Sequence, residues 1–192
     1  MENEDYLVVD LEATCDNGGL VPRREMEIIE IGAVLVDGKT MEATREFQTF
    51  VRPVRHPRLT PFCTELTSIT QDDVADAPGF VDAIAGLTDF IGSDAPLFSS
   101  WGNYDDGQFK QDAQFHGAPL PFGGRHFNIK AAFSEHLNTR KRFGMSAALK
   151  RLGLPLHGTH HRGIDDARNI ARILPYVVRT APRPRLHETS NH

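Results

Sequence analysis

The chain of 192 residues has only two cysteines, Cys15 and Cys63, and lacks any long hydrophobic run. The two cysteines have neither metal-ligand spacing nor a disulfide framework around them, so we expect free thiols in a reducing, cytoplasmic setting. No apolar run approaches the ~20 residues that a membrane helix needs. Residues 1–5, MENED, are acidic rather than basic, so no signal peptide is expected.

Positive charge is also scarce. The chain has 21 lysines and arginines against 26 aspartates and glutamates, which gives a formal net charge of −5. A hydrophobic content of 40% is enough for a core, and the length fits one α/β domain. We expect this domain to span residues 1–181. Residues 182–192 contain too few apolar side chains to dock on a core and are expected to form a disordered tail.

Hydrophobic periodicity and turn signals predict the order of the elements. Strands are expected near 5–12, 27–37 and 44–52, as an antiparallel meander with turns at Asp16–Gly19 and Asp37–Gly38. An irregular segment that contains Pro53, Pro57 and Pro61 follows. The remaining expected elements are strands near 96–101 and 126–129 and helices near 78–92, 104–116, 130–138, 145–152 and 164–179. This order predicts a mixed five-stranded sheet flanked by helices.

Two carboxylates stand at the end of the first predicted strand. Tyr6 to Leu11 form a short apolar run, and alternate strand residues face the same side, so Asp10 and Glu12 project from one face. Side by side on a hydrophobic strand, they repel each other and are poorly solvated. A divalent cation with oxygen ligands is the natural partner. The alternative is that both acids lie just past the strand in a solvated loop.

The last predicted helix carries another inward-facing acid. One of its faces is apolar except for the first member: Asp166, Ile170, Ile173 and Val177. The opposite face is predicted to be solvated: Asp165, Arg168, Asn169, Arg172 and Arg179. Asp165 then reads as a first-turn acid favoured by the helix dipole. Asp166 points toward the core, where an ionised carboxylate needs a partner.

His161 lies five residues before Asp166, just outside the start of this helix. A lone histidine is more often structural or an ordinary surface residue. Beside an inward-facing aspartate it is a candidate general base, because its pKa is near neutral.

Three segments in this order resemble the motifs of the DEDDh 3′→5′ exonuclease family, in particular its Eri1-like branch. They are VVDLEATCD, SWGNYD and the H-x-G-x-x-D stretch from His161 to Asp166. The flanking stretches EIIEIGAVLVD and FVRPVRHPRLTPFCTELTSIT resemble the second strand and the substrate-side connection of the same branch. The resemblance covers roughly residues 5–180, with Gly163 standing where many members carry alanine. It implies a ribonuclease H-like fold.

The resemblance also implies a catalytic site. Asp10, Glu12, Asp105 and Asp166 would hold two Mg²⁺ or Mn²⁺ ions that clamp the attacking and leaving oxygens of a phosphodiester. His161 would act as the general base and contact the substrate, and the products would be nucleoside 5′-monophosphates. Helical periodicity does not choose between Asp105 and Asp106, because both lie near Phe109 on a helical wheel. Only Asp105 aligns with the family motif.

Aromatic residues near the motifs match positions where the family stacks terminal bases. Phe62 and Tyr104 would stack on the bases. Stacking of this kind does not depend on which base is present. Leu66 would wedge between the last two bases, and the backbone at Ala13 and Thr14 would reach the terminal sugar. The alternative for Phe62 is ordinary core packing.

The implied substrate is a single-stranded nucleic-acid end with a free 3′ terminus. The Eri1-like flanks favour RNA, and a DNA-directed proofreading-type exonuclease is the alternative. A catalytically silent nucleic-acid-binding protein is disfavoured because all five site residues are present. Basic residues gather in three groups: Arg52, Arg55, His56 and Arg58; Arg140, Lys141 and Arg142; Lys150, Arg151, His157, His160 and Arg162. Overall acidity predicts weak non-specific affinity for duplexes.

Overall fold

The computed structural model describes residues 4–93 and 95–178, and its centre is one five-stranded sheet. The strands are β1 (Tyr6–Ala13), β2 (Ile28–Val36), β3 (Ala43–Phe50), β4 (Leu97–Ser100) and β5 (His126–Asn128), in the order β3-β2-β1-β4-β5. The first three strands pair antiparallel, while β4 runs parallel to both β1 and β5. The predicted meander and the predicted mixed sheet are both confirmed.

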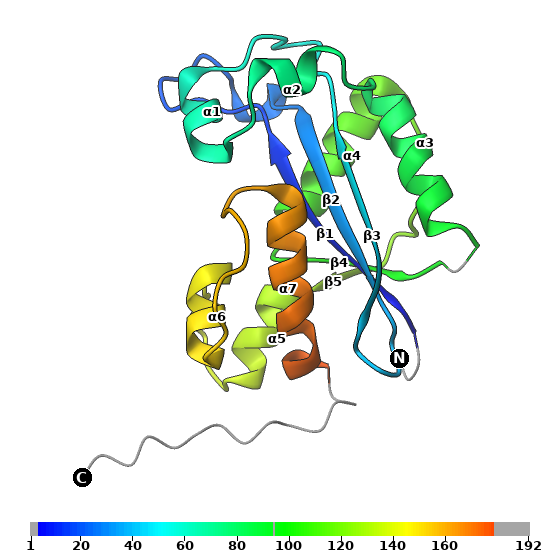
Figure 1. Cartoon of the computed structure of the whole chain (residues 1–192), viewed down its shortest axis with the longest axis vertical. Helices are drawn as coiled ribbons and strands as arrows, with labels where there is room; N and C mark the ends of the chain where they lie inside the picture. Colours follow the sequence, from blue (N-terminus) through cyan, green and yellow to red (C-terminus); the bar gives the residue numbers. More distant parts are fainter. Residues whose placement is uncertain (1–3, 94, 179–192) are drawn as a thin grey trace.

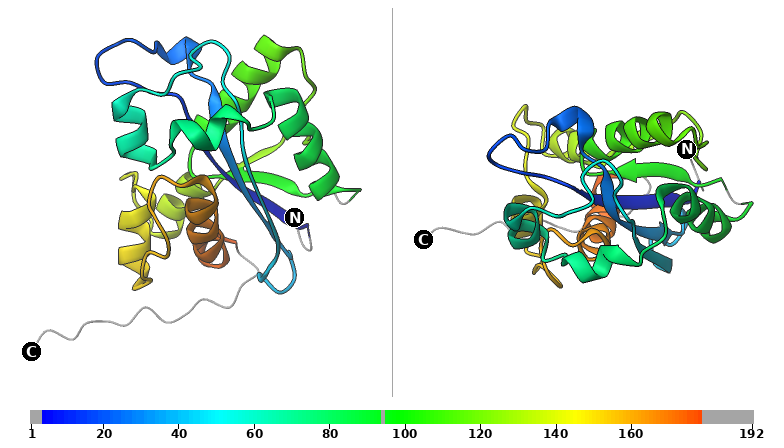
Figure 2. Two further views of the ribbon diagram at one scale, coloured as in Figure 1. Left: turned by 45° about the horizontal axis from the view of Figure 1, so that its top comes forward. Right: turned by 90° about the horizontal axis from the view of Figure 1, so that it is seen from above.

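Helices cover both faces of the sheet, which is seen edge-on from above in Figure 2. On one face, α7 (Gly163–Val177) packs on β1 and β2, α5 (Ile129–His136) packs on α7 and β4, and α6 (Met145–Leu152) packs on α7, around a core that includes Val8 and Val34. On the other face, α3 (Phe80–Ile91) and α4 (Tyr104–His116) pack on Leu7 and Val9. Because strand residues alternate between faces, Asp10 and Glu12 share the α7 side of β1 with Val8.

The segment expected to be irregular contains two short helices above the sheet (Figure 1), so that expectation is wrong in part. Helix α1 (Pro61–Thr67) begins with proline, and the Thr60 side chain accepts a hydrogen bond from the Cys63 amide. Helix α2 (Gln71–Ala75) begins with a reciprocal capping box between Thr70 and Asp73. Pro61 stands at the first helical position, where its missing amide costs nothing, so it starts the helix rather than preventing it.

Asn169 is fully buried, which contradicts its assignment to the solvated face of α7. Its side-chain oxygen accepts a hydrogen bond from the His157 amide, and its side-chain nitrogen donates to the carbonyls of His157 and Asp165. The polar side chain is buried because it forms hydrogen bonds with the backbone of a neighbouring loop. A helical wheel cannot predict such contacts.

Two glycines let the start of α7 lie directly on the sheet. A Cβ atom on Gly32 in β2 would overlap the backbone of Gly163 and Ile164. A Cβ on Gly163 would come to 3.0 Å from the Asp10 carbonyl oxygen and 3.2 Å from the Gly32 amide nitrogen. Backbone therefore meets backbone here, and the first turn of α7 is fixed beside the end of β1.

The proposed domain end at residue 181, the tail 182–192 and the last predicted residue of α7 lie outside the described residues. Among the described residues, no helix is both long and apolar enough to cross a membrane.

Gly32→Ala is expected to lower the free energy of unfolding by about 3 kcal/mol or more, because the added methyl group meets immovable backbone. Urea denaturation would measure the change. Gly86→Ala in α3 is the matched control, since its methyl group would meet only the Phe47 ring, at 3.7 Å, and alanine favours a helix interior. Equal loss of stability in both variants would contradict the close approach.

Candidate active site

Three acidic side chains converge where β1 meets α7. Carboxylate oxygens of Asp10, Glu12 and Asp166 all lie within 4.8 Å of one another. Asp10 and Glu12 come from β1, and Asp166 comes from the first turn of α7. Acids from elements near opposite ends of the chain therefore meet at one point.

Asp105, from the first turn of α4, lies beside β1 but is not one of the acids whose oxygens lie within 4.8 Å of one another. Its Oδ1 accepts a hydrogen bond from the Leu11 amide at 3.1 Å, which ties the start of α4 to β1 between Asp10 and Glu12. Its neighbour Asp106 instead pairs with Lys110 on the outside of the helix. The structure thus distinguishes two aspartates that periodicity left equivalent.

Burial raises the pKa of all four acids, and for Asp10 and Glu12 the charges of neighbouring acids raise it further. For Asp10, burial raises the pKa well above its usual range, and the charge of Asp105 adds to the effect. Burial, followed by the charge of Asp166, raises the pKa of Glu12 to about 8. Burial raises the pKa of Asp105 to about 6, although the Leu11 amide opposes it. Ionising all of these acids together is costly, so the group favours a bound cation.

One oxygen of Asp166 provides a test of whether a metal fits. Oδ1 is buried and has no hydrogen-bond partner among the described residues, while Oδ2 accepts from the His161 amide at 3.0 Å. A buried carboxylate oxygen without a partner is unfavourable. A cation would satisfy it, and an all-carboxylate donor set suits Mg²⁺ or Mn²⁺.

The two histidines before α7 lie face to face. Their rings stack with centroids 4.1 Å apart, and the His161 backbone has a left-handed φ of 63°. The sequence pattern singles out His161, but the imidazole within hydrogen-bonding distance of Asp166 is His160, with Nδ1 at 2.8 Å from Oδ2. Burial, followed by the nearby His160, lowers the pKa of His161. The only sequence signal for His160 was its place beside His161.

Asp165 shapes the histidine loop and is more than the solvated first-turn acid predicted. Its Oδ2 accepts from the Thr159 amide at 2.9 Å, and Oδ1 accepts from Arg168 at 3.0 Å. Gly158 has a φ of 72°, and a Cβ there would overlap the Asp165 carboxylate. Asp165 therefore holds the turn that precedes His160 and His161.

Glu30 is the residue of this region that the sequence motifs missed. It is fully buried in β2, opposite Glu12, and its Oε2 accepts from the Gly163 amide at 3.0 Å and from Arg162 Nε at 3.2 Å. Its other oxygen accepts from Gln48 at 3.0 Å. No side chain of α7 itself caps the helix start. Glu30 supplies that cap from the sheet, and its place as the one acid in the apolar run IIEIGAVLV was its signal.

The candidate substrate residues lie around the same point. Phe62 is half-buried on α1, and Leu66 is 37% exposed. Helix α1 is tied to the end of β1, because Thr60 Oγ1 donates to the Cys15 carbonyl at 2.6 Å and the Cys63 thiol contacts the Ala13 carbonyl at 3.7 Å.

Ala13 and Thr14 are buried. The amide of Thr14 donates to the carbonyl of Glu27, the residue just before β2, at 2.8 Å, so in the free protein it is already hydrogen-bonded. Trp101 packs on Phe133 and donates to the Phe143 carbonyl.

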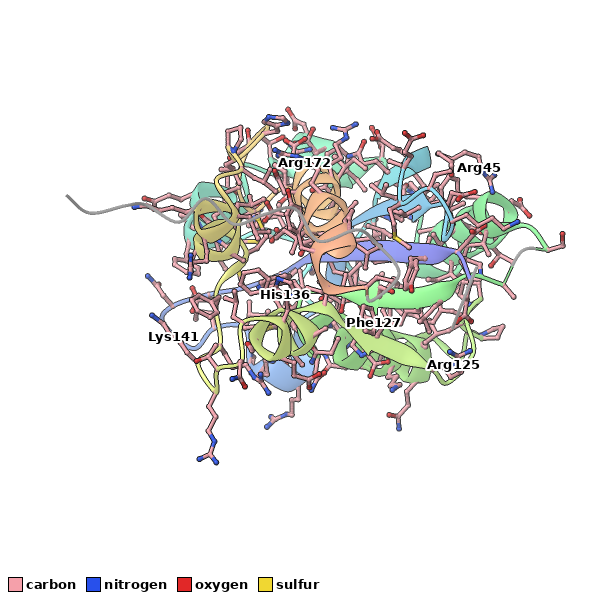
Figure 3. All side chains as sticks on the ribbon, turned by 90° about the horizontal axis from the view of Figure 1, so that it is seen from below. Arg45, Arg125, Phe127, His136, Lys141 and Arg172 are labelled. Atoms are coloured by element: carbon pink, nitrogen blue, oxygen red, sulfur yellow. The ribbon has the colours of Figure 1, made fainter. Side chains whose placement is uncertain are left out.

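The first basic group is anchored by buried acids. Glu27 accepts from the amides of Val54, Arg55 and His56, and Asp112 contacts the Arg55 guanidinium at 3.4 Å. From the third group, Arg162 pairs with Glu30. Lys141 of the second group lies at the opposite side of the molecule from Arg125 (Figure 3). In the first and third groups, Arg55 and Arg162 are thus paired with buried acids.

The thermal stability of the metal-free protein should depend on pH, and a bound metal should reduce this dependence. Because the pKa of Glu12 is about 8 in the folded protein against 4.5 normally, its contribution to stability is complete below about pH 4.5 and is lost as the pH rises through 8. In a chelator, the melting temperature should fall from about pH 5 to about pH 8, and Mg²⁺ or Mn²⁺ should raise it most at the upper end.

Differential scanning fluorimetry would measure this dependence. Glu12→Gln should flatten the fall, whereas Glu42→Gln, an exposed acid between β2 and β3, should not. An unchanged slope in Glu12→Gln would contradict the arrangement.

Comparison with known proteins agrees with the resemblance of the sequence motifs to exonucleases. The Exonuclease family model (RNase_T) matches residues 7–174. ERI1 exoribonuclease 3 of Homo sapiens is 34% identical over 178 residues, covering 88% of this chain and 52% of that protein. The Probable 3'-5' exonuclease KapD of Bacillus subtilis (strain 168) is 30% identical over 179 residues, covering 92% of this chain and 86% of that protein. The chain thus spans about half the length of the ERI1 exoribonuclease 3 proteins.

Solved structures agree on the architecture. The nuclease domain of 3'hExo, described as a DEDDh family member and bound to rAMP, superposes with a TM-score of 0.83 at 30% identity and covers 90% of both chains. Cell-death related nuclease 4 has the same fold, with a TM-score of 0.79 at 20% identity. The ribonuclease H-like fold and the Eri1-like resemblance are confirmed, and the chain belongs to the exonuclease family.

Proposed function

We propose that the chain is a metal-dependent 3′→5′ exoribonuclease. It would shorten single-stranded RNA from a free 3′ end and release nucleoside 5′-monophosphates. The convergence of Asp10, Glu12, Asp105 and Asp166, with one buried Asp166 oxygen left unpaired, is the observation that supports this most. The names of the relatives, which include exoribonucleases, and the rAMP bound by the solved nuclease domain favour RNA over DNA.

Each residue has a chemical role in this proposal. The four carboxylates would hold two Mg²⁺ or Mn²⁺ ions. When bound, such ions supply positive charge that stabilises the attacking and leaving oxygens of a phosphodiester. His161 accepts the proton of the attacking water. Its lowered pKa keeps the imidazole neutral, and therefore basic, at and somewhat below neutral pH.

The substrate end would lie across the upper part of the molecule in Figure 1, over α1 and the start of α4. Phe62 and Tyr104 would stack on terminal bases, with Leu66 between the last two bases and the backbone of Ala13 and Thr14 at the sugar. This arrangement is supported by the ties of α1 to Cys15 and Ala13, which hold the helix that carries Phe62 and Leu66 against the end of β1.

The exonuclease domain is placed at residues 1–181, which the family match over 7–174 supports. Cytoplasmic residence remains part of the proposal, and it is consistent with Cys15 and Cys63 both being free thiols.

The direct test uses 5′-labelled RNA and DNA oligomers, single-stranded and duplex, with Mg²⁺ or Mn²⁺. A ladder that shortens from the 3′ end of single-stranded RNA, with 5′-monophosphate products, is expected. Internal cuts, release of nucleotides from the 5′ end, or preference for DNA would contradict the proposal.

Asp105→Asn should lower turnover about 100-fold or more, because the amide keeps the shape but loses the charge that holds the cation. Asp106→Asn is the matched control, since it removes the same charge one residue away from a side chain that pairs outward with Lys110. Steady-state rates on the RNA oligomer measure both. Equal effects would remove Asp105 from the site.

His161→Ala should lower the turnover rate by about 10²–10⁴-fold, while metal affinity measured by calorimetry stays near that of the wild type. The acidic limb of the pH–rate profile should disappear, because protonation of His161 is what abolishes activity at low pH. His160→Ala should retain that limb and lose about tenfold at most, since it removes only a hydrogen-bond partner of Asp166. If His160→Ala removes the limb instead, His160 is the base.

A further inference from the structure

Arg23 lies on the ring of Tyr104. Its guanidinium carbon is 4.3 Å from the ring centroid, and Nη1 donates to Gln108 Oε1 at 3.0 Å. Tyr104 and Gln108 are one turn apart on α4, so they share a face of the helix. Arg23 thus spans the first turn of α4, beside Asp105.

The connection between β1 and β2 is built to hold Arg23 in this place. Arg23 opens a short 3₁₀ turn, Arg23–Glu25, which is closed by a hydrogen bond from the Glu25 amide to the Pro22 carbonyl at 2.7 Å. The carbonyl of Met26 just after it accepts from Gln108 at 2.9 Å and from Gln111 at 2.7 Å. These bonds anchor the turn to α4 on the side of Arg23.

Arg24 provides an internal comparison. Its side chain is 83% exposed and pairs with Glu25 at 3.4 Å. The two arginines carry the same charge at neighbouring positions, yet Arg23 is the one stacked on an aromatic ring and hydrogen-bonded to a buried glutamine.

We propose that Arg23 is a positioning residue for the 3′-terminal nucleotide. By covering one face of Tyr104 and bonding to Gln108, it fixes the ring so that the other face can stack on the terminal base. This inference rests on the proposed exonuclease function. A planar guanidinium suits the task, because it stacks on aromatic rings while keeping its donors in a fixed plane. The ligand class is any nucleobase, since stacking tolerates base identity.

Steady-state kinetics would compare oligomers that end in an ordinary nucleotide with oligomers that end in an abasic nucleotide. Arg23→Ala should raise the KM for the ordinary end about threefold to tenfold, with kcat within about twofold. It should leave the KM for the abasic end unchanged, because that end has no base to stack. Arg24→Ala, with the same change in charge, should leave both KM values unchanged.

Two further variants separate stacking from charge. Arg23→Lys keeps the charge but loses the plane, so it should behave like Arg23→Ala. Tyr104→Ala should itself raise the KM, and adding Arg23→Ala to it should have little additional effect, because the arginine acts through the ring. Equal KM increases in Arg23→Ala and Arg24→Ala, rescue by Arg23→Lys, or equal effects on both oligomers would overturn the inference.

Binding distinguishes failure of this inference from failure of the proposed function. In the Asp10→Asn background, which should keep the oligomer intact, a 3′-terminal 2-aminopurine reports stacking through quenched fluorescence. If the wild type does not shorten RNA but Arg23→Ala still weakens quenching and Arg24→Ala does not, the proposed function is wrong and the role of Arg23 stands. If quenching is absent or insensitive to Arg23, the inference is wrong whatever the activity.

Discussion

The contact between the start of α7 and strand β2 fixes the position of the acidic site. Gly32 and Gly163 allow the two backbones to lie in contact, and Glu30 accepts a hydrogen bond from the first amide of the helix. Asp166 follows one turn into α7, so this contact places it against Asp10 and Glu12. Without the contact, the acids of β1 would face solvent and could avoid one another. Because the contact is present, the site acids repel one another in the metal-free protein, and this repulsion raises the pKa values of Asp10 and Glu12.

Glu30 makes this arrangement costly to alter. Its charge contributes to the raised pKa values of Asp10 and Glu12, yet its own oxygens are engaged by Gly163, Arg162 and Gln48. The protein therefore places an additional negative charge beside the site in order to hold α7. Glu30 thus opposes the ionisation of its neighbours while it satisfies a buried helix terminus.

The sequence predicted the strands and most helices closely, because their hydrophobic periods are local. It also predicted that Asp10, Glu12 and Asp166 face inward, since each stands in line with apolar neighbours. Interactions between distant segments were not predictable in the same way. Nothing local shows that Asn169 satisfies the backbone of His157, or that Glu30 caps a helix more than a hundred residues away. The contact of His160 with Asp166 likewise depends on a left-handed residue in the loop, for which the sequence offers no rule.

Glu27, the residue just before β2, accepts hydrogen bonds from three successive amides of the loop at Val54–His56. Glu27 and Glu30 are three residues apart, which in an extended chain corresponds to about 10 Å. The distance between that basic loop and the start of α7 is thus set by the covalent length of one strand rather than by side-chain packing. A substitution can loosen either attachment. Only an insertion or deletion between Glu27 and Glu30 could change the distance between the two attachments. A change of one residue would also turn one of the two acids to the opposite face of the sheet.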